Sequence, residues 1–268
     1  MFVLPNLFTV SSIFFGFYAM TLCAGEASPP QLYQAALAIF FGIFFDGFDG
    51  RVARLTRTQS LFGQELDSLA DLVTFGAAPA LLVWKWALGG LGLVGVAASF
   101  LFAACGALRL ARFNVLAIRS PHGGASRFFV GMPIPFAAAG VVSVIIAFQN
   151  AHGGELPERW RWPVLVFVVF LALLMVSTVR YRTFKDVRPT PGILLLLAGV
   201  VGVGVVVATQ IHPAYVLVAY FGLYLVSGFI ESAIMLRRYL IDRKAASLAD
   251  VVDEDEDPLD EEDNQEVL

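Results

Sequence analysis

Charged residues are scarce in this sequence, and the few that occur are unevenly placed. Only 15% of the 268 residues are Asp, Glu, Lys or Arg, whereas 58% are hydrophobic and the mean hydropathy is +0.75. Soluble domains carry about 25% charged residues. Apolar runs of about 18 residues or more recur, and each can cross a hydrocarbon core of roughly 30 Å. The composition therefore excludes an ordinary water-soluble domain and predicts an all-α polytopic membrane protein.

The sequence has only two cysteines and shows no sign of a cleavable signal peptide. Cys23 and Cys105 stand in separate apolar runs and form neither a metal-ligand cluster nor a disulfide framework, so we expect two small buried side chains. Residues 1–25 lack the basic stretch that opens a cleavable signal peptide. We therefore expect the first apolar run to remain as a membrane span.

Basic residues are absent from the C-terminal stretch 250–268, which carries eleven acids. We expect this stretch to be a disordered, solvated tail. The whole chain has a net charge of -4, but without the tail it has 11 acids and 18 bases, a charge of +7. A basic body suits anionic lipid or phosphate-bearing ligands, or it serves only to set the membrane orientation.

The apolar runs predict about eight transmembrane helices, separated by Gly, Pro and charge clusters. We expect them near residues 4–24, 31–49, 67–87, 91–112, 131–149, 161–179, 192–210 and 213–237.

The basic residues predict the orientation of these spans. Fifteen of the eighteen fall on one side, and the exceptions are Lys85, Arg159 and Arg161. The positive-inside rule then places both termini in the cytoplasm (N-in/C-in). The turn between the second and third helices is cytoplasmic in this arrangement.

That turn and its flanks hold an unusual group of acids. Asp46 and Asp49 are three residues apart, and Asp67 and Asp71 are four apart, so each pair shares a helix face. Four unpaired carboxylates at the membrane surface would repel one another and lose hydration. Because Mg²⁺ and Mn²⁺ prefer carboxylate oxygens, we expect these aspartates to bind such an ion. Glu65 lies two residues from Asp67 and points to another face, so it is not included.

These residues form the pattern D-x-x-D-G-x-x-A-R-x8-G-x-x-x-D-x-x-x-D, with Gly50, Ala53, Arg54 and Gly63 at the remaining fixed positions. The pattern resembles the signature of the CDP-alcohol phosphotransferase family. Other segments resemble the bacterial phosphatidylserine synthase branch of that family. They are "LPNLFTVSSIFFGF" (4–17), "GQELDSLADLVTFGAAPA" (63–80), "CGALRLARFNV" (105–115), "FFVGMPIPFAAAG" (128–140) and "MVSTVRYRTFK" (175–185).

The resemblance implies a family core over 1–187. Outside it we expect two further helices over 188–248, which resemble longer members of the branch only in hydropathy, and an acidic tail over 249–268. The resemblance implies transfer of a phosphatidyl group from CDP-diacylglycerol to L-serine, using Mg²⁺ or Mn²⁺ at Asp46, Asp49, Asp67 and Asp71. Asp71 would be the general base. Contacts to the nucleotide end would come from Asn6, Thr9, Asp49, Gly50, Arg54, Ser60 and Gly63. The resemblance also implies a homodimer in the cytoplasmic (inner) membrane of a prokaryote, with its site facing the cytoplasm and no nucleic-acid partner.

Several interpretations remain open from the residues alone. Arg109 and Arg112, with Asn114 beyond them, either bind serine or a lipid phosphate or anchor a helix by their charge. Asn6 and Thr9 either contact nucleotide or serve helix capping and packing. The two prolines of "GMPIPFAA" interrupt a span, either as a packing kink or because freed backbone groups line a polar cavity.

The function also has alternatives. One alternative keeps the same fold and chemistry but uses another alcohol as acceptor, such as glycerol 3-phosphate or inositol phosphate. Another replaces the diacyl donor with an ether lipid. A transporter with an ion site is a remote alternative, because such sites lie near the membrane midplane and no inverted repeat is visible.

Overall fold

A computed structural model describes residues 3–56, 60–119, 128–153, 156–182, 199, 202 and 215–228. The described chain is almost entirely helical, and six of its helices are long and apolar enough to cross a membrane. They follow the first six predicted helices in order. The prediction for 192–210 lies outside the described residues apart from 199 and 202, and so does the tail. Within 213–237 the described part is a shorter apolar helix, Tyr215–Gly228.

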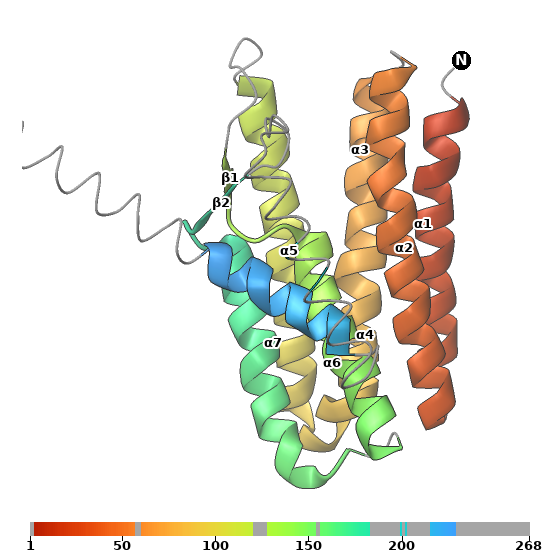
Figure 1. The fold of residues 1–268 in the computed structure, drawn as a ribbon, viewed down its shortest axis with the longest axis vertical. Coiled ribbons are helices and arrows are strands. Elements are labelled where there is room, and N and C mark those ends of the chain that lie inside the picture. Colours follow the sequence, from red (N-terminus) through yellow and green to blue (C-terminus); the bar gives the residue numbers. More distant parts are fainter. Residues whose placement is uncertain are drawn as a thin grey trace, which may run out of the picture.

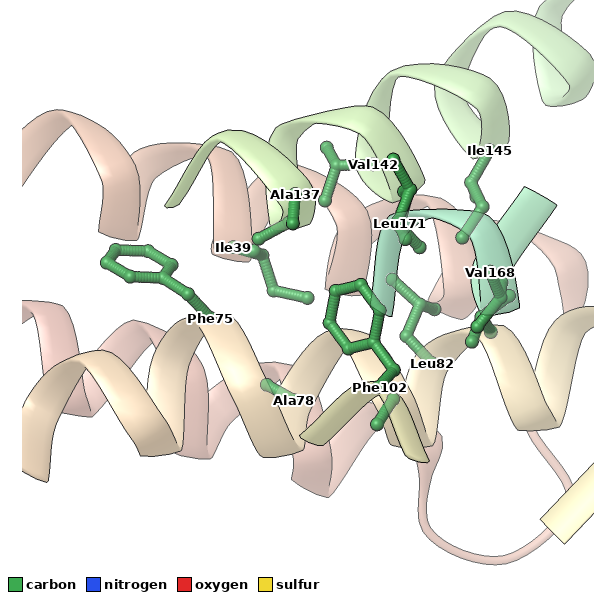
Figure 2. Close-up of a cluster of buried hydrophobic side chains, with 14 of the residues drawn as sticks. Ile39, Phe75, Ala78, Leu82, Phe102, Ala137, Val142, Ile145, Val168 and Leu171 are labelled. Atoms are coloured by element: carbon green, nitrogen blue, oxygen red, sulfur yellow. The ribbon is translucent and has the colours of Figure 1, made fainter. Parts of the chain in front are cut away.

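Helices α1 (Val3–Cys23), α2 (Pro29–Leu55) and α3 (Leu61–Asp71) lie side by side (Figure 1). Helices α5 (Leu93–Arg119), α6 (Ile134–His152) and α7 (Arg161–Val176) form the rest of the bundle. Side chains from both groups meet in one apolar core (Figure 2). Its labelled members are Ile39, Phe75, Ala78, Leu82, Phe102, Ala137, Val142, Ile145, Val168 and Leu171.

The third span begins earlier than predicted. Helix α3 starts at Leu61 rather than near 67, because the Ser60 hydroxyl oxygen accepts a hydrogen bond from the Gly63 N–H at 3.0 Å. A serine at this position satisfies one of the unpaired amides of a first helical turn. The helix can therefore extend through the polar residues that precede the apolar run, and it carries Gly63, Asp67 and Asp71 on one rigid element.

The same span contains two π-helical stretches. It continues from α3 through the π-helical stretch η1 (Leu72–Ala77), the helix α4 (Ala78–Val83), a second π-helical stretch η2 (Trp84–Leu88) and the 3-10 turn η3 (Gly89–Leu91). Pro79 stands just after η1. A proline lacks an N–H and crowds the preceding turn, and a π-helical stretch relieves that crowding.

Thr74 of η1 sits where α1 and α2 approach the third span. Its hydroxyl donates a hydrogen bond to the Ser12 carbonyl oxygen at 3.0 Å, and the side chain is fully buried. A Cβ added to Gly16 would lie 2.7 Å from Thr74 Cα, and one added to Gly42 would lie 2.7 Å from Thr74 Cγ2. Small residues allow such close helix approach within a membrane. This crossing fixes α2 and the third span relative to each other, close to the parts of α2 and α3 that carry the aspartates.

The prolines of "GMPIPFAA" begin a helix instead of interrupting one, which corrects the predicted span over 131–149. Pro133 is the N-cap residue of α6 and Pro135 lies in its first turn, where a missing N–H removes no helical hydrogen bond. The preceding backbone is held by the end of α7. The Gly131 N–H donates to the Val179 carbonyl at 2.8 Å, and the Met132 N–H donates to the Leu174 carbonyl at 3.0 Å.

A small antiparallel sheet was not predicted. Strand β1 (Phe128–Val130) pairs with β2 (Arg180–Arg182), with Phe129 opposite Tyr181. This pair joins the segments before α6 and after α7. It is the one addition to the predicted all-helical class within the described chain.

Candidate active site

Helices α2 and α3 bring the four predicted aspartates together. Carboxylate oxygens of Asp46, Asp49 and Asp67 all lie within 4.8 Å of one another. Asp71 is outside that group of three, but its carboxyl lies within hydrogen-bonding reach of Asp46, as Asp67 does of Asp49. The predicted pairing of two helix faces is therefore present in the structure.

The cluster is largely shielded from solvent. Asp49 is buried, and the other three aspartates are partly buried. Among the described residues, Asp67 Oδ1 and Asp71 Oδ1 are buried without a hydrogen-bond partner. A buried carboxylate oxygen that lacks a partner is costly, and several carboxylates in one site repel.

These oxygens form a donor set that fits a hard divalent cation. Such an ion would offset the repulsion and give the unpartnered oxygens a ligand. Glu65 is exposed, in agreement with its omission from the predicted set.

The residues predicted to contact the nucleotide gather next to the cluster. The Thr9 hydroxyl of α1 donates to Asp49 Oδ2 at 3.0 Å in a buried position. The Gly50 N–H donates to Asp49 Oδ1. These bonds hold one carboxylate from two sides and give Thr9 an interhelical packing role.

The first turn of α3 lies against the start of α1. A Cβ added to Gly63 would lie 3.2 Å from Ser60 Oγ and 3.8 Å from Asn6 Oδ1. Gly63 therefore leaves room between two polar oxygens that any larger side chain would fill. Arg54 belongs to the last turns of α2, and its side chain lies outside the described part of the chain.

The three residues predicted to bind serine or a lipid phosphate differ in their surroundings. Arg109 of α5 is only 8% exposed and lies close enough to Asp71 for an electrostatic interaction. Its guanidinium carbon is 5.9 Å from the centre of the Phe113 ring, and its Nε is buried without a hydrogen-bond partner among the described residues. The structure thus brings Arg109 to the aspartate cluster.

Arg112 and Asn114 hold neighbouring helices. Arg112 Nη1 donates to the Val176 carbonyl at the end of α7 at 3.0 Å. Asn114 Nδ2 donates to Ser68 Oγ at 3.0 Å, which ties α5 to α3 between Asp67 and Asp71.

Sequence reasoning missed two residues near the site. Ser68 lies between the aspartates but on another helix face, so the motif spacing gave no signal for it. Tyr224 of the helix Tyr215–Gly228 lies close enough to Arg109 for an electrostatic interaction. One tyrosine within an apolar run carries no pattern that distinguishes it from the others.

Known proteins are similar to this chain along most of its length. A sequence model of the CDP-alcohol phosphatidyltransferase family matches residues 2–203. A Helicobacter pylori (strain ATCC 700392 / 26695) protein named CDP-diacylglycerol–serine O-phosphatidyltransferase is 36% identical over 247 residues, covering 92% of this chain and 98% of its own length. Proteins of the same name from Bacillus subtilis and Saccharomyces cerevisiae are 39% and 40% identical over 58% and 53% of this chain, and 78% and 52% of their own.

Proposed function

Because the chain belongs to the CDP-alcohol phosphatidyltransferase family, we propose that it transfers a phosphatidyl group from CDP-diacylglycerol to L-serine, giving phosphatidylserine and CMP. The observation that carries this proposal is the four-aspartate cluster, present in a chain 36% identical to almost the whole length of a relative named CDP-diacylglycerol–serine O-phosphatidyltransferase. The motif supports the reaction type, and the similarity along the full chain supports serine as the acceptor.

The aspartates are proposed to hold Mg²⁺ or Mn²⁺ through Asp46, Asp49, Asp67 and Asp71. A bound divalent ion would neutralise charge on the pyrophosphate and on the departing CMP. Asp49 is preset for this role, because Thr9 and the Gly50 N–H already fix both of its oxygens.

Asp71 is the proposed general base. It takes the proton of the serine hydroxyl while the serine oxygen attacks the phosphorus that carries the diacylglycerol. The bond between that phosphorus and the oxygen bridging to CMP breaks, and CMP leaves with the bonding electrons. Asp71 suits this position because it lies one turn beyond Asp67 and outside the tightest group of three, and one of its oxygens has no hydrogen-bond partner among the described residues.

The substrates would reach this centre from two sides. The nucleotide end lies along Asn6, Thr9, Asp49, Gly50, Arg54, Ser60 and Gly63, where α1, α2 and α3 converge. Arg109 is the proposed contact for the acceptor's carboxylate, because a buried guanidinium pairs well with such a group. Arg112 and Asn114 support the helices around it through the Val176 carbonyl and Ser68.

The reaction also suggests how the protein lies in the membrane. CDP-diacylglycerol has its acyl chains in the bilayer, whereas serine and CMP are soluble. A site at the cytoplasmic surface of a prokaryotic inner membrane lets them meet, and the basic residues favour that side. We retain the proposals of eight spans with both termini inside, a core over 1–187, two further helices over 188–248 and a homodimer.

The test is CMP release by purified protein in detergent, supplied with CDP-diacylglycerol and Mg²⁺ or Mn²⁺. L-serine, glycerol 3-phosphate and inositol phosphate are added separately. In a further set of assays, an ether-linked CDP-lipid replaces CDP-diacylglycerol as the donor. Release that requires serine supports the proposal. Release with another alcohol contradicts the acceptor assignment and keeps the chemistry, and no release with any of them contradicts the proposal as a whole.

A further inference from the structure

Helix α1 carries none of the four aspartates, yet both helices that carry them pack against it. The backbones of α2 and α3 themselves approach each other closely at few points within the described chain. The separation of the two aspartate pairs therefore depends on contacts made further along the spans.

Those contacts meet at Thr74, three residues beyond Asp71 in the π-helical stretch η1. The Thr74 hydroxyl donates to the Ser12 carbonyl of α1 at 3.0 Å, and the Ser12 hydroxyl donates in turn to the Gly42 carbonyl of α2 at 3.3 Å. Thr74 and Ser12 are both fully buried. A buried hydrogen bond is costly to break, because the freed groups cannot turn to water. Two such bonds thus join the third span to α2 through α1.

The third span also touches α2 directly at Gly42. A Cβ added there would lie 2.7 Å from Thr74 Cγ2, whereas unbonded carbon atoms pack at about 3.5–4.0 Å. Gly42 stands four residues, about one helical turn, before Asp46. The contact therefore lies within about one turn of the aspartates on both spans. A closely packed interior transmits strain, so a wider contact here would move the two aspartate pairs apart.

We propose that Gly42 and Thr74 are positioning residues, which set the separation of the two aspartate pairs and so the size of the metal site. The inference rests on the proposed function, because it takes the aspartates as ligands of Mg²⁺ or Mn²⁺. Mg²⁺ demands oxygen ligands at about 2.0–2.1 Å in near-ideal geometry, so a small change in separation lowers the affinity. Gly42 has no side chain, and the Thr74 hydroxyl is directed to the Ser12 carbonyl. Each therefore acts through the helix that carries the ligands.

The test exchanges size across this contact in the full chain and follows Mn²⁺ binding by electron paramagnetic resonance. Gly42→Ala forces α2 and the third span apart, and we expect the affinity for the tightly bound Mn²⁺ to fall about tenfold. Thr74→Ser removes the methyl group that the new Cβ would meet and keeps the hydroxyl. The double variant Gly42→Ala/Thr74→Ser should therefore regain most of the wild-type affinity.

The matched control is Gly140→Ala, which also inserts a methyl group into a tight contact. On α6, which carries none of the aspartates, the added Cβ would lie 2.6 Å from the Phe221 ring. Gly140→Ala should lower the Tm, as Gly42→Ala does, and leave the Mn²⁺ affinity unchanged. If Gly42→Ala yields no folded protein, Thr74→Val takes its place, because it keeps the shape of the side chain and removes the hydroxyl. Thr74→Val should weaken Mn²⁺ binding about fivefold, the effect of one lost hydrogen bond.

The outcomes separate this inference from the proposed function. Unchanged Mn²⁺ affinity in Gly42→Ala, or in Thr74→Val where that variant takes its place, overturns the inference alone when the wild type binds the ion and makes phosphatidylserine. An equal loss of affinity in Gly140→Ala does the same, and so does a double variant that binds Mn²⁺ no better than Gly42→Ala. A folded wild type that binds no Mn²⁺ overturns the metal site of the proposed function and this inference with it.

Discussion

Two polar regions meet along α3, and they differ in whether their buried polar atoms have hydrogen-bond partners. On one face, Asp67 and Asp71 each leave a buried carboxylate oxygen without a partner among the described residues. On another, Ser68 exchanges hydrogen bonds with Asn114, and two residues back along α5 the Arg112 side chain donates a hydrogen bond to the Val176 carbonyl. The two regions lie within one helical turn of each other.

The difference separates groups that hold the fold from groups available to a ligand. Buried polar atoms are normally satisfied within a protein, so each exception calls for a physical reason. The Asn114 and Arg112 bonds explain why those residues stand in an apolar bundle. The carboxylates have no such internal explanation, and a cation with its phosphate substrate supplies one.

The largest effect is expected at the carboxylates. Asp71→Asn should lower kcat by about 10²–10⁴, because it removes the proposed general base, and it should weaken nucleotide binding less than Asp46→Asn does. Asp46→Asn should weaken both turnover and nucleotide binding, because a metal ligand is lost. Steady-state kinetics and CMP titration by calorimetry measure the two effects. Equal losses of CMP affinity in the two variants would refute this division of roles.

A smaller effect on stability is expected at the helix crossing that carries both regions. Gly16→Ala places a methyl group within 2.7 Å of the Thr74 backbone, so the crossing must widen. Overpacking of this kind destabilises a protein by about 1–3 kcal/mol. Thermal unfolding in detergent should show a lower Tm than wild type. The control is Gly222→Ala, where an added Cβ meets no atom of the described residues within 4 Å. If both variants unfold at the wild-type temperature, the close approach of α1 does not stabilise the bundle.

The smallest effect is expected at the hydrogen-bonded pair of Asn114 and Ser68. Asn114→Ala should destabilise the protein by about 0.5–1.5 kcal/mol, as for one ordinary hydrogen bond, and leave the KM for serine unchanged. Ser68→Ala removes the other partner of the same hydrogen bond. The double variant should therefore be about as stable as either single variant, because the bond can be lost only once. A raised serine KM in Asn114→Ala at unchanged Tm would move this residue from the supporting group into the acceptor site.

The sequence was sufficient for the features that depend on local pattern. Hydropathy located the first six helices, and the spacing of Asp46, Asp49, Asp67 and Asp71 predicted that their side chains converge. Hydropathy failed at the start of α3, because the Ser60 cap carries the helix into polar residues that a hydropathy profile treats as a loop. It also failed at Pro133, where the backbone bonds to α7 come from far along the chain.

The sequence also could not predict contacts between segments that lie far apart along the chain. The β1–β2 pair joins segments about fifty residues apart, and neither strand has the length that a sequence pattern requires. Arg109 and Arg112 share a helix face and look equivalent in sequence. Only the packing of α3, α7 and the helix Tyr215–Gly228 around them gives one a carboxylate neighbour and the other a helix end.

The most direct test of the central claim is Mn²⁺ binding to the purified protein, followed by electron paramagnetic resonance. Because the tail also carries acids, Asp67→Asn is compared with Asp260→Asn, which removes one acid from that tail. The account predicts that wild type and Asp260→Asn bind Mn²⁺ alike, and that Asp67→Asn loses the tightly bound ion. Equal binding in all three proteins would contradict the claim that the aspartates of α2 and α3 form the metal site.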